Sequence, residues 1–270
     1  MELTEPPSFV SHRSILLSHG ARTPKAFLLL HGLTASPLQF ATFGQALFER
    51  GANVFIPRLP RHGLSDRLTT SLAGLTADEL DAFAHETVEA ARALGERLVV
   101  AGFSVGGLLA AWIAQHVEVD RVVPIAPFLG LVGVPRRVAP SLARLALRMP
   151  NQFVWWHPVL RERQQPEHGY PRYPTHALAQ SYHLAQQLLA DAAQRAPQAR
   201  DIEIVLNASE TAVNNRSARR LARLWSGHGH APVAVESLGG LPPSHDIIEP
   251  LAWPRLAARV YPKLIEIVDG

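Results

Sequence analysis

The 270-residue sequence contains no cysteine and only two lysines, Lys25 and Lys263. The absence of cysteine excludes disulfide bonds, thiol nucleophiles and thiolate metal sites. A covalent catalyst built from this sequence must therefore use a hydroxyl, a carboxylate or one of the two lysines.

Long hydrophobic runs are also missing. No stretch reaches the roughly 20 predominantly apolar residues that a transmembrane helix needs, so no stable insertion into a membrane is expected. Residues Met1 to Val10 are acidic and contain proline, whereas a signal peptide begins with basic residues followed by an apolar core. These observations predict a cytoplasmic protein.

Basic residues are numerous but not concentrated. The chain has 26 Lys+Arg against 23 Asp+Glu, for a formal net charge of +3. The arginines are scattered and interleaved with acidic residues, whereas a nucleic-acid-binding domain gathers basic residues into a stripe with stacking aromatic rings. No nucleic acid partner is therefore expected.

Hydrophobic residues make up 47% of the chain, enough to bury a full core. Short apolar runs bounded by turn residues alternate with segments of helical periodicity, as is typical of parallel strands joined by crossover helices. The expected strands are Ala26 to Leu30, Asn53 to Ile56, Arg97 to Ala101, Val119 to Ile125, Ile202 to Leu206 and Val233 to Ser237, with an antiparallel edge strand near Ser14 to Ser18. The expected helices are Leu38 to Arg50, Thr76 to Leu94, Ser104 to His116, Ala177 to Ala193, Ser217 to Trp225 and Leu251 to Ile267, the last kinked or split at Pro262. The pattern predicts an α/β fold with a mostly parallel sheet.

The alternation of strands and helices breaks between Pro127 and Pro174, where prolines, arginines and large aromatic residues gather. An irregular connection of this length is uncommon in a compact domain unless it is functional or disordered, and so many aromatic rings argue against disorder. We therefore interpret residues 127–174 as an insert that caps the carboxyl edge of the sheet, and residues 1–126 and 175–270 as the core domain. The candidates for lining a substrate pocket are Phe128, Phe153, Trp155 and Trp156.

The segment Gly102-Phe103-Ser104-Val105-Gly106 joins an expected strand to an expected helix. A serine on such a turn adopts strained backbone angles that expose its hydroxyl, and the residues two before and two after it must be small to avoid a clash. Gly102 and Gly106 meet this requirement. The pattern favours Ser104 as a nucleophile; the alternative is a glycine-rich helix start that Ser104 caps.

A serine hydroxyl is a poor nucleophile near neutral pH, so Ser104 needs a base and a carboxylate that orients the base. In this architecture the acid and then the histidine follow on loops after later strands. Glu210 is the only carboxylate in the loop 207–213, and His245 lies in the loop that follows the last expected strand. The alternatives are a solvated loop charge at Glu210 and a surface histidine at His245, and Asp246 is a second candidate for the orienting carboxylate.

Other histidines have different expected roles. His228 and His230 precede the last strand and are interpreted as surface residues; their spacing suits a metal ion, but no third ligand follows nearby, so no metal is expected. His31 ends the first central strand. It is expected to shape a loop whose backbone N–H at Leu33 forms an oxyanion hole with that of Val105, the alternative being an ordinary turn.

Four segments in order, His31-Gly32-Leu33-Thr34, Leu59-Pro60-Arg61-His62-Gly63, Gly102-Phe103-Ser104-Val105-Gly106-Gly107 and Ser244-His245-Asp246, resemble bacterial carboxylesterases and monoacylglycerol lipases of the α/β-hydrolase superfamily. The resemblance covers residues 26–267. It implies an α/β-hydrolase fold, a triad of Ser104, Glu210 and His245, an oxyanion hole from the Leu33 and Val105 backbones, and a lid formed by the insert.

The chain departs from these relatives at two positions. The acid is usually aspartate where this chain has Glu210. Glycine often stands where this chain has Arg61, a change expected to alter the rim of the pocket.

The expected function is the hydrolysis of carboxylic esters through an acyl-enzyme, without a cofactor. The expected partner is a small-molecule ester with an apolar acyl or alcohol group. Carbon–carbon bond hydrolases, amidases and perhydrolases use the same triad and remain alternatives, as does a noncatalytic binding module of this fold. A serine at the nucleophile position excludes the branches that use an aspartate nucleophile.

Overall fold

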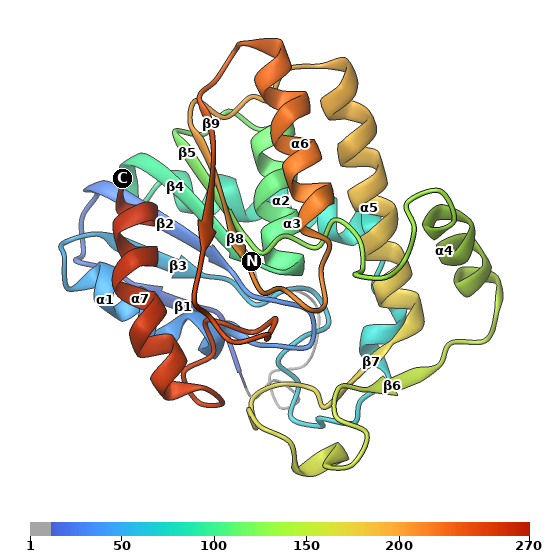
Figure 1. Ribbon diagram of the computed structural model, residues 1–270. Coiled ribbons are helices and arrows are strands. Elements are labelled where there is room, and N and C mark those ends of the chain that lie inside the picture. The colour runs from blue at the N-terminus through green and yellow to red at the C-terminus, as the bar shows by residue number, and fades with distance from the viewer. Residues whose placement is uncertain (1–11) are drawn as a thin grey trace.

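A seven-stranded sheet forms the centre of the protein in a computed structural model that describes residues 12–270 (Figure 1). In spatial order the strands are β1 (Ile15–Leu17), β3 (Asn53–Ile56), β2 (Thr23–Leu30), β4 (Gly95–Phe103), β5 (Arg121–Ile125), β8 (Ile202–Asn207) and β9 (Val233–Leu238). The edge strand β1 pairs antiparallel with β3, and all the other pairs are parallel. The mostly parallel sheet and its antiparallel edge strand are thus confirmed.

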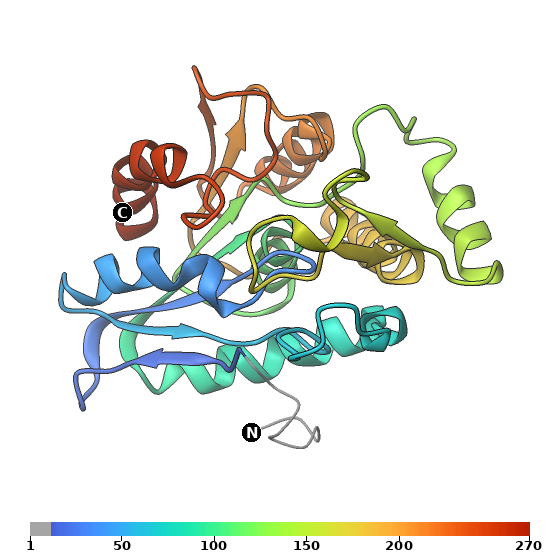
Figure 2. The same cartoon turned by 90° about the horizontal axis from the view of Figure 1, so that it is seen from below.

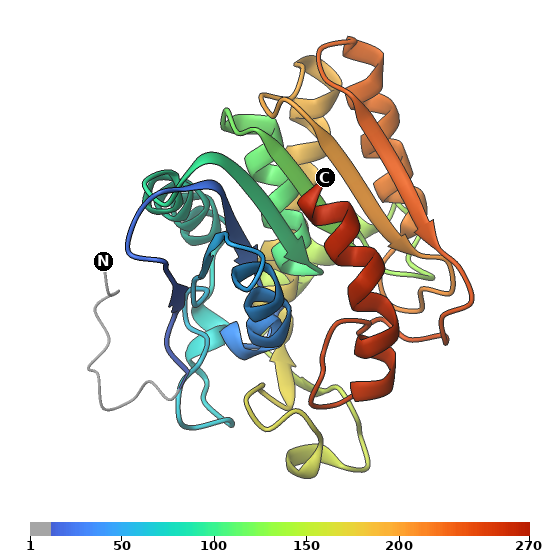
Figure 3. The same ribbon diagram turned by 90° about the vertical axis from the view of Figure 1, so that its left-hand side faces the viewer.

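Helices cover both faces of this sheet. Their bounds are α1 (Ala41–Phe48), α2 (Ala77–Arg92), α3 (Val105–His116), α4 (Ala139–Arg148), α5 (Thr175–Gln194), α6 (Asn215–His228) and α7 (Pro254–Asp269). Helices α1 and α7 pack together on one face, and α2, α3, α5 and α6 lie on the other (Figures 1 and 3). Single 3-10 turns are η2 (Pro37–Phe40), η3 (Ser71–Gly74) and η4 (Arg161–Arg163).

Local sequence signals account for several helix ends. Thr76 and Glu79 form a capping box at the start of α2, in which each side chain accepts a hydrogen bond from the other residue's backbone N–H. Of the two alternatives expected at Pro262, a kink or a split, the split is wrong, because α7 continues through this proline as one helix. Its buried residues Tyr261 and Leu264 flank Pro262 on both sides, so packing holds the helix together despite the missing N–H.

The register of the central strands determines where their carboxyl ends meet. Leu30, the last residue of β2, pairs with Gly102 near the end of β4. The loop after β2 and the turn after β4 therefore leave the sheet side by side. Every residue of α3 from Val105 to Gln115 is buried, so the helix that follows this turn lies in the interior.

Residues 127–174, which we call the cap segment, have secondary structure of their own. They contain α4, η4 and a two-stranded antiparallel sheet of β6 (Phe153–Trp155) and β7 (Arg172–Pro174). Figures 1 and 2 show α4 at the edge of the molecule, where it packs against α5. The division of the chain into a core and a cap stays a prediction.

Among residues 12–270, none of the helices combines the length and the apolar character required to cross a membrane.

Candidate active site

Ser104 occupies a strained turn between β4 and α3. Its backbone angles are φ 58° and ψ −114°, a conformation that costs a non-glycine residue about 1–3 kcal/mol. A Cβ on Gly102 would lie 2.0 Å from the carbonyl oxygen of Gly106, and a Cβ on Gly106 would lie 1.9 Å from that of Leu30. These short distances explain the predicted requirement for two glycines, because a side chain at either position would collide with a backbone oxygen. The Ser104 side chain makes no capping hydrogen bond to α3, so the helix-cap alternative is wrong.

The side chains of Ser104, His245 and Glu210 form a continuous chain of contacts. His245 Nε2 lies 2.8 Å from Ser104 Oγ, and His245 Nδ1 lies 3.0 Å from Glu210 Oε2. Because a carboxylate can only accept, Nδ1 carries the proton, and Nε2 of the neutral ring then accepts the serine hydroxyl proton. The structure therefore brings together three residues from three separate loops.

Glu210 is a buried, ionised carboxylate. Its side chain is 1% exposed, which contradicts the alternative of a solvated loop charge. Its Oε1 accepts the N–H groups of Thr211, Ala212 and Val213 at 2.8, 2.7 and 3.3 Å. Burial favours the protonated form, but the hydrogen bond and charge of His245, together with the N–H donors, outweigh it and hold the pKa of Glu210 below its usual value.

Asp246, the other candidate for the orienting carboxylate, faces its own loop. Its Oδ1 accepts the N–H groups of Ile248 and Glu249 at 3.3 and 3.1 Å. Burial of the carboxylate and the nearby Glu249 raise the pKa of Asp246 to about 6. The geometry thus favours Glu210 over Asp246 as the partner of the His245 ring.

Two backbone N–H groups beside Ser104 lack partners. Leu33 and Val105 are both buried, and within residues 12–270 the N–H of neither residue donates a hydrogen bond. Gly32 lies next to the serine, since a Cβ on it would be 3.5 Å from Ser104 Cβ. Unpaired buried N–H groups are rare in proteins. A pair of them beside a serine is the arrangement that an oxyanion hole requires.

Two buried histidines hold the loop that carries Leu33. His31 accepts the Leu59 N–H at Nε2 (3.1 Å) and donates from Nδ1 to the Gly32 carbonyl (3.0 Å). His62 accepts the Thr34 N–H at Nε2 (3.0 Å) and donates from Nδ1 to Pro60 (2.8 Å). Burial lowers the pKa of His31 well below its ordinary value and that of His62 to about 4. Both rings are therefore neutral cross-links between two loops.

The backbone at Arg61 explains one departure from the relatives. Its φ is +66°, a left-handed conformation that glycine adopts without strain. Its guanidinium forms hydrogen bonds with the Glu79 carboxylate, the shortest at 2.8 Å. The side chain is thus bound to α2, whereas the sequence predicted an effect on the pocket rim.

An apolar cavity of about 180 Å³ lies between the cap segment and α5. Its lining residues are Phe128, Leu131, Val134, Ala139, Leu142, Ala143, Ala146, Thr175, Leu178, Ala179 and Tyr182. Of these lining residues, Phe128 lies nearest to Ser104 along the backbone hydrogen bonds, because its N–H donates to the Ser104 carbonyl (2.9 Å).

The other three predicted pocket residues lie elsewhere in the cap segment. The Arg172 guanidinium packs on the rings of Phe153 and Trp155, at 4.3 and 5.7 Å from the ring centroids. Trp156 donates from Nε1 to Thr34 Oγ1 at 2.8 Å. Only the sequence position of Phe128, three residues after the end of β5, could have separated it from the others.

Residues 12–270 contain no cluster of three side chains placed to ligate a metal ion. His228 contacts the Ala192 carbonyl through Nε2 at 2.9 Å, so this histidine is used in packing α6 against α5.

Comparison with solved structures shows the same fold in lipolytic enzymes. One of the metagenome-derived lipolytic enzymes LipS and LipT is 17% identical, with 96% of this chain and 98% of that chain covered and a TM-score of 0.68. A monoacylglycerol lipase from Paleococcus ferrophilus is 15% identical, with 94% and 97% covered and a TM-score of 0.67. A soluble variant of a monoglyceride lipase from Saccharomyces cerevisiae is 14% identical, with 95% and 91% covered and a TM-score of 0.69.

At these identities the likeness shows the fold alone. A search of curated protein sequences gives no match. The family model of the alpha/beta hydrolase fold matches residues 25–225, which is more than half of the chain. The chain therefore belongs to the α/β-hydrolase family.

Proposed function

We propose that this protein hydrolyses carboxylic esters, with Ser104 as nucleophile, His245 as general base and Glu210 as the carboxylate that orients the base. The observation that carries the proposal is the chain of contacts from Ser104 Oγ to His245 Nε2 (2.8 Å) and from His245 Nδ1 to Glu210 Oε2 (3.0 Å). Hydrogen-bond distances at both links are what nucleophilic catalysis by serine requires.

In the first half of the reaction, Ser104 Oγ attacks the ester carbonyl while His245 Nε2 takes the hydroxyl proton. The negative charge that develops on the carbonyl oxygen is stabilised by the N–H groups of Leu33 and Val105, the latter at the positive end of α3. His245 then donates its proton to the leaving alcohol, and the acyl group stays on Ser104.

In the second half, a water molecule replaces the alcohol. His245 takes a proton from the water, which attacks the acyl carbonyl, and the acid leaves as Ser104 regains its proton. Throughout, the ionised Glu210 stabilises the imidazolium and keeps the proton of the neutral ring on Nδ1.

The substrate we propose is an ester with an apolar acyl or alcohol group. The apolar cavity next to Phe128 supports this choice, as do the solved structures of similar fold, which include lipolytic enzymes and monoacylglycerol lipases. In this proposal the cap segment serves as the lid of the site, since it contributes the cavity wall opposite α5.

A panel of p-nitrophenyl esters from acetate to palmitate, run beside an anilide and a monoacylglycerol, tests the proposal. Ester cleavage should dominate, and Ser104→Ala should lower it by several orders of magnitude, about a millionfold in a well-studied triad. Faster cleavage of the anilide would make the protein an amidase. Failure of a fluorophosphonate to label Ser104 would favour a noncatalytic binding module instead.

A further inference from the structure

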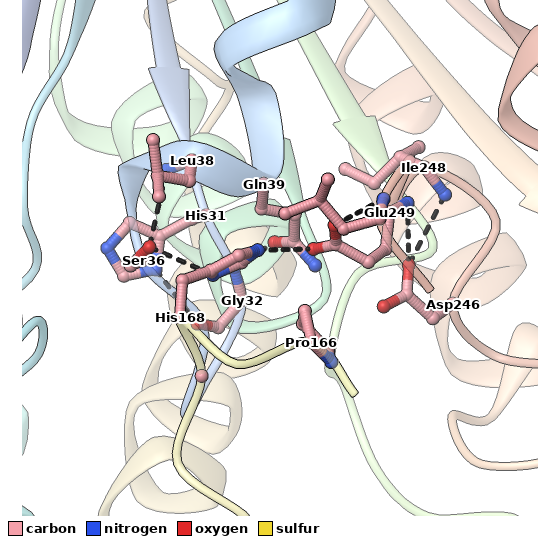
Figure 4. Close-up of polar contacts among 12 residues, drawn as sticks. His31, Gly32, Ser36, Leu38, Gln39, Pro166, His168, Asp246, Ile248 and Glu249 are labelled. Carbon is pink, nitrogen blue, oxygen red and sulfur yellow. Dashed lines mark hydrogen bonds and ion pairs between the residues drawn. The ribbon is translucent and has the colours of Figure 1, made fainter. Parts of the chain in front are cut away.

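A buried polar cluster lies outside the proposed catalytic residues and consists of His168, Ser36 and Glu249. It centres on His168, which the cap segment places between η4 and β7. The His168 side chain is 2% exposed and that of Glu249 is 0% exposed, and Ser36 is also fully buried. Figure 4 shows the imidazole between Ser36 on one side and Glu249 on the other.

His168 contacts both neighbours directly. Its Nδ1 lies 2.9 Å from Ser36 Oγ. Its Nε2 lies 3.1 Å from Glu249 Oε2, and within the described residues neither of these two atoms has an aligned hydrogen-bond partner. A buried carboxylate needs a proton donor or a cation close by. Among residues 12–270, His168 is the only residue whose side chain forms a pair with the Glu249 carboxylate.

Ser36 and Glu249 each lie close in sequence to a proposed catalytic group. Ser36 caps η2 by accepting the Leu38 N–H (3.3 Å), and it lies three residues after Leu33 on the same loop. Glu249 lies four residues after His245, and the turn between them is held by Asp246, which accepts the Glu249 N–H (3.1 Å). A displacement of His168 would therefore move two loops together: residues 31–36, which carry the Leu33 N–H and which we call the oxyanion loop, and the loop that carries His245.

Two residues that follow His168 in the cap segment, Gly169 and Tyr170, also contact the oxyanion loop. The Tyr170 N–H donates to the Thr34 carbonyl (2.7 Å). A Cβ on Gly169 would lie 3.1 Å from the same oxygen. Residues 168–170 thus lie directly against the loop that carries the Leu33 N–H.

We infer that His168 is a positioning residue: one imidazole from the cap segment holds the oxyanion loop through Ser36 and the His245 loop through Glu249. The inference rests on the proposed function. In this inference His168 helps to fix the positions of the proposed catalytic groups. A misplacement of about 1 Å can lower the rate about 100-fold, even when the substitution that causes it lies far from the reacting atoms.

Two amide substitutions separate the two contacts. The side-chain amide of asparagine can occupy the place of Nδ1, and that of glutamine the place of Nε2. His168→Asn should therefore keep the Ser36 contact and lose the Glu249 contact, while His168→Gln should do the reverse. His168→Ala loses both.

The measurement is kcat and KM for p-nitrophenyl acetate, which is too short to depend on the apolar cavity. His168→Ala should lower kcat about 10- to 100-fold with KM changed less than about twofold, since alignment and not binding is lost. His168→Asn and His168→Gln should each lose less. Glu249→Gln should add little further loss in the His168→Ala background, because the two residues act through one contact.

His116 supplies a matched control. Its Nε2 lies 2.9 Å from Asp191 Oδ2, with side chains 17% and 27% exposed, at the end of α3 remote from Ser104. His116→Ala also breaks a histidine–carboxylate contact, and it should leave kcat unchanged whatever its effect on the melting temperature.

The outcomes separate this inference from the proposed function. Wild-type hydrolysis and fluorophosphonate labelling of Ser104 test the function itself. With these established, a kcat within twofold of wild type for folded His168→Ala, or equal losses of kcat for His168→Ala and His116→Ala, would overturn the positioning role. If His168→Ala fails to fold, wild-type kcat in both amide variants would overturn it equally.

Discussion

The imidazole of His245 stacks on the ring of Phe103, with ring centroids 4.9 Å apart and planes inclined by 30°. Phe103 immediately precedes Ser104, so the turn that presents the proposed nucleophile also supplies a flat surface for the proposed base, His245. A stack of this kind contributes about 0.5–1.5 kcal/mol.

Phe103→Leu should lower kcat by about two- to tenfold, because leucine fills the space but offers no flat surface against which the ring can rest. KM should not change. Steady-state kinetics with p-nitrophenyl acetate would measure this. An unchanged kcat would mean that Glu210 alone orients His245.

Glu210→Gln should reduce turnover severely, by about ten-thousandfold as in a well-studied triad, because the amide lacks the charge and can stabilise the wrong tautomer. Glu210→Asp should be milder, since it retains the charge on a shorter side chain. Asp246→Asn serves as the control, because asparagine can still accept the N–H groups of Ile248 and Glu249. Collapse of activity in Asp246→Asn with near-normal Glu210→Gln would exchange the roles of the two acids.

The sequence predicts the sheet from local signals, and it identifies in advance three residues whose side chains the structure brings into contact. Apolar runs identify the strands, and the spacing Gly102-Phe103-Ser104-Val105-Gly106 requires the backbone approach that the structure shows. Glu210 and His245 follow from strand order alone. These features need no knowledge of how distant side chains pack.

The cap segment could not be predicted in the same way. Its aromatic residues are alike in sequence, yet Phe128 lines the cavity while Trp156 binds Thr34. The roles of His62 and His168 depend on contacts with residues 28 and 132 positions away. No local sequence pattern predicts contacts between residues so far apart, so only the tertiary structure reveals the roles of these two histidines.

Substitutions that fill the apolar cavity should shorten the preferred acyl chain. Ala143→Leu or Ala179→Leu places a larger side chain in the lining. Hydrolysis of octanoate and longer esters should fall about tenfold or more while acetate hydrolysis is retained, since each methylene in an apolar pocket is worth about 1–3 kcal/mol. Trp155→Ala, outside the lining, should leave the chain-length profile unchanged. If Trp155→Ala changed the chain-length profile and the two leucine variants did not, the acyl chain would lie against β6 instead.

Asp246→Asn should stabilise the protein at neutral pH. The residue as a whole is partly buried, but its carboxylate is desolvated, which raises its pKa from 3.8 to about 6. The folded state therefore binds the proton more tightly than the unfolded state, and stability falls as pH rises from about 4 to 6. The variant removes this loss, which is at most about 3 kcal/mol. Urea denaturation at pH 4.5 and 7.5 should show a larger difference in stability between variant and wild type at the higher pH.

His62 should give the opposite dependence on pH. Burial lowers the pKa of His62 from 6.5 to about 4, so between these values the unfolded state binds the proton and the folded state does not. Stability is then complete above about pH 6.5 and is lost as pH falls towards 4, by up to about 3 kcal/mol. His31, whose pKa is lowered in the same direction, should add to this loss.

His62→Gln tests this linkage, because the glutamine oxygen can accept the Thr34 N–H that Nε2 accepts in the wild type. The comparison belongs in the Asp246→Asn background, which removes the opposing titration in the same range. Urea denaturation from pH 7.5 to 4.5 should show a shallower loss of stability in the His62→Gln variant than in its parent. Parallel curves would mean that His62 is protonated in the folded protein at moderate pH, and then its Nε2 could not hold the loop that carries Leu33.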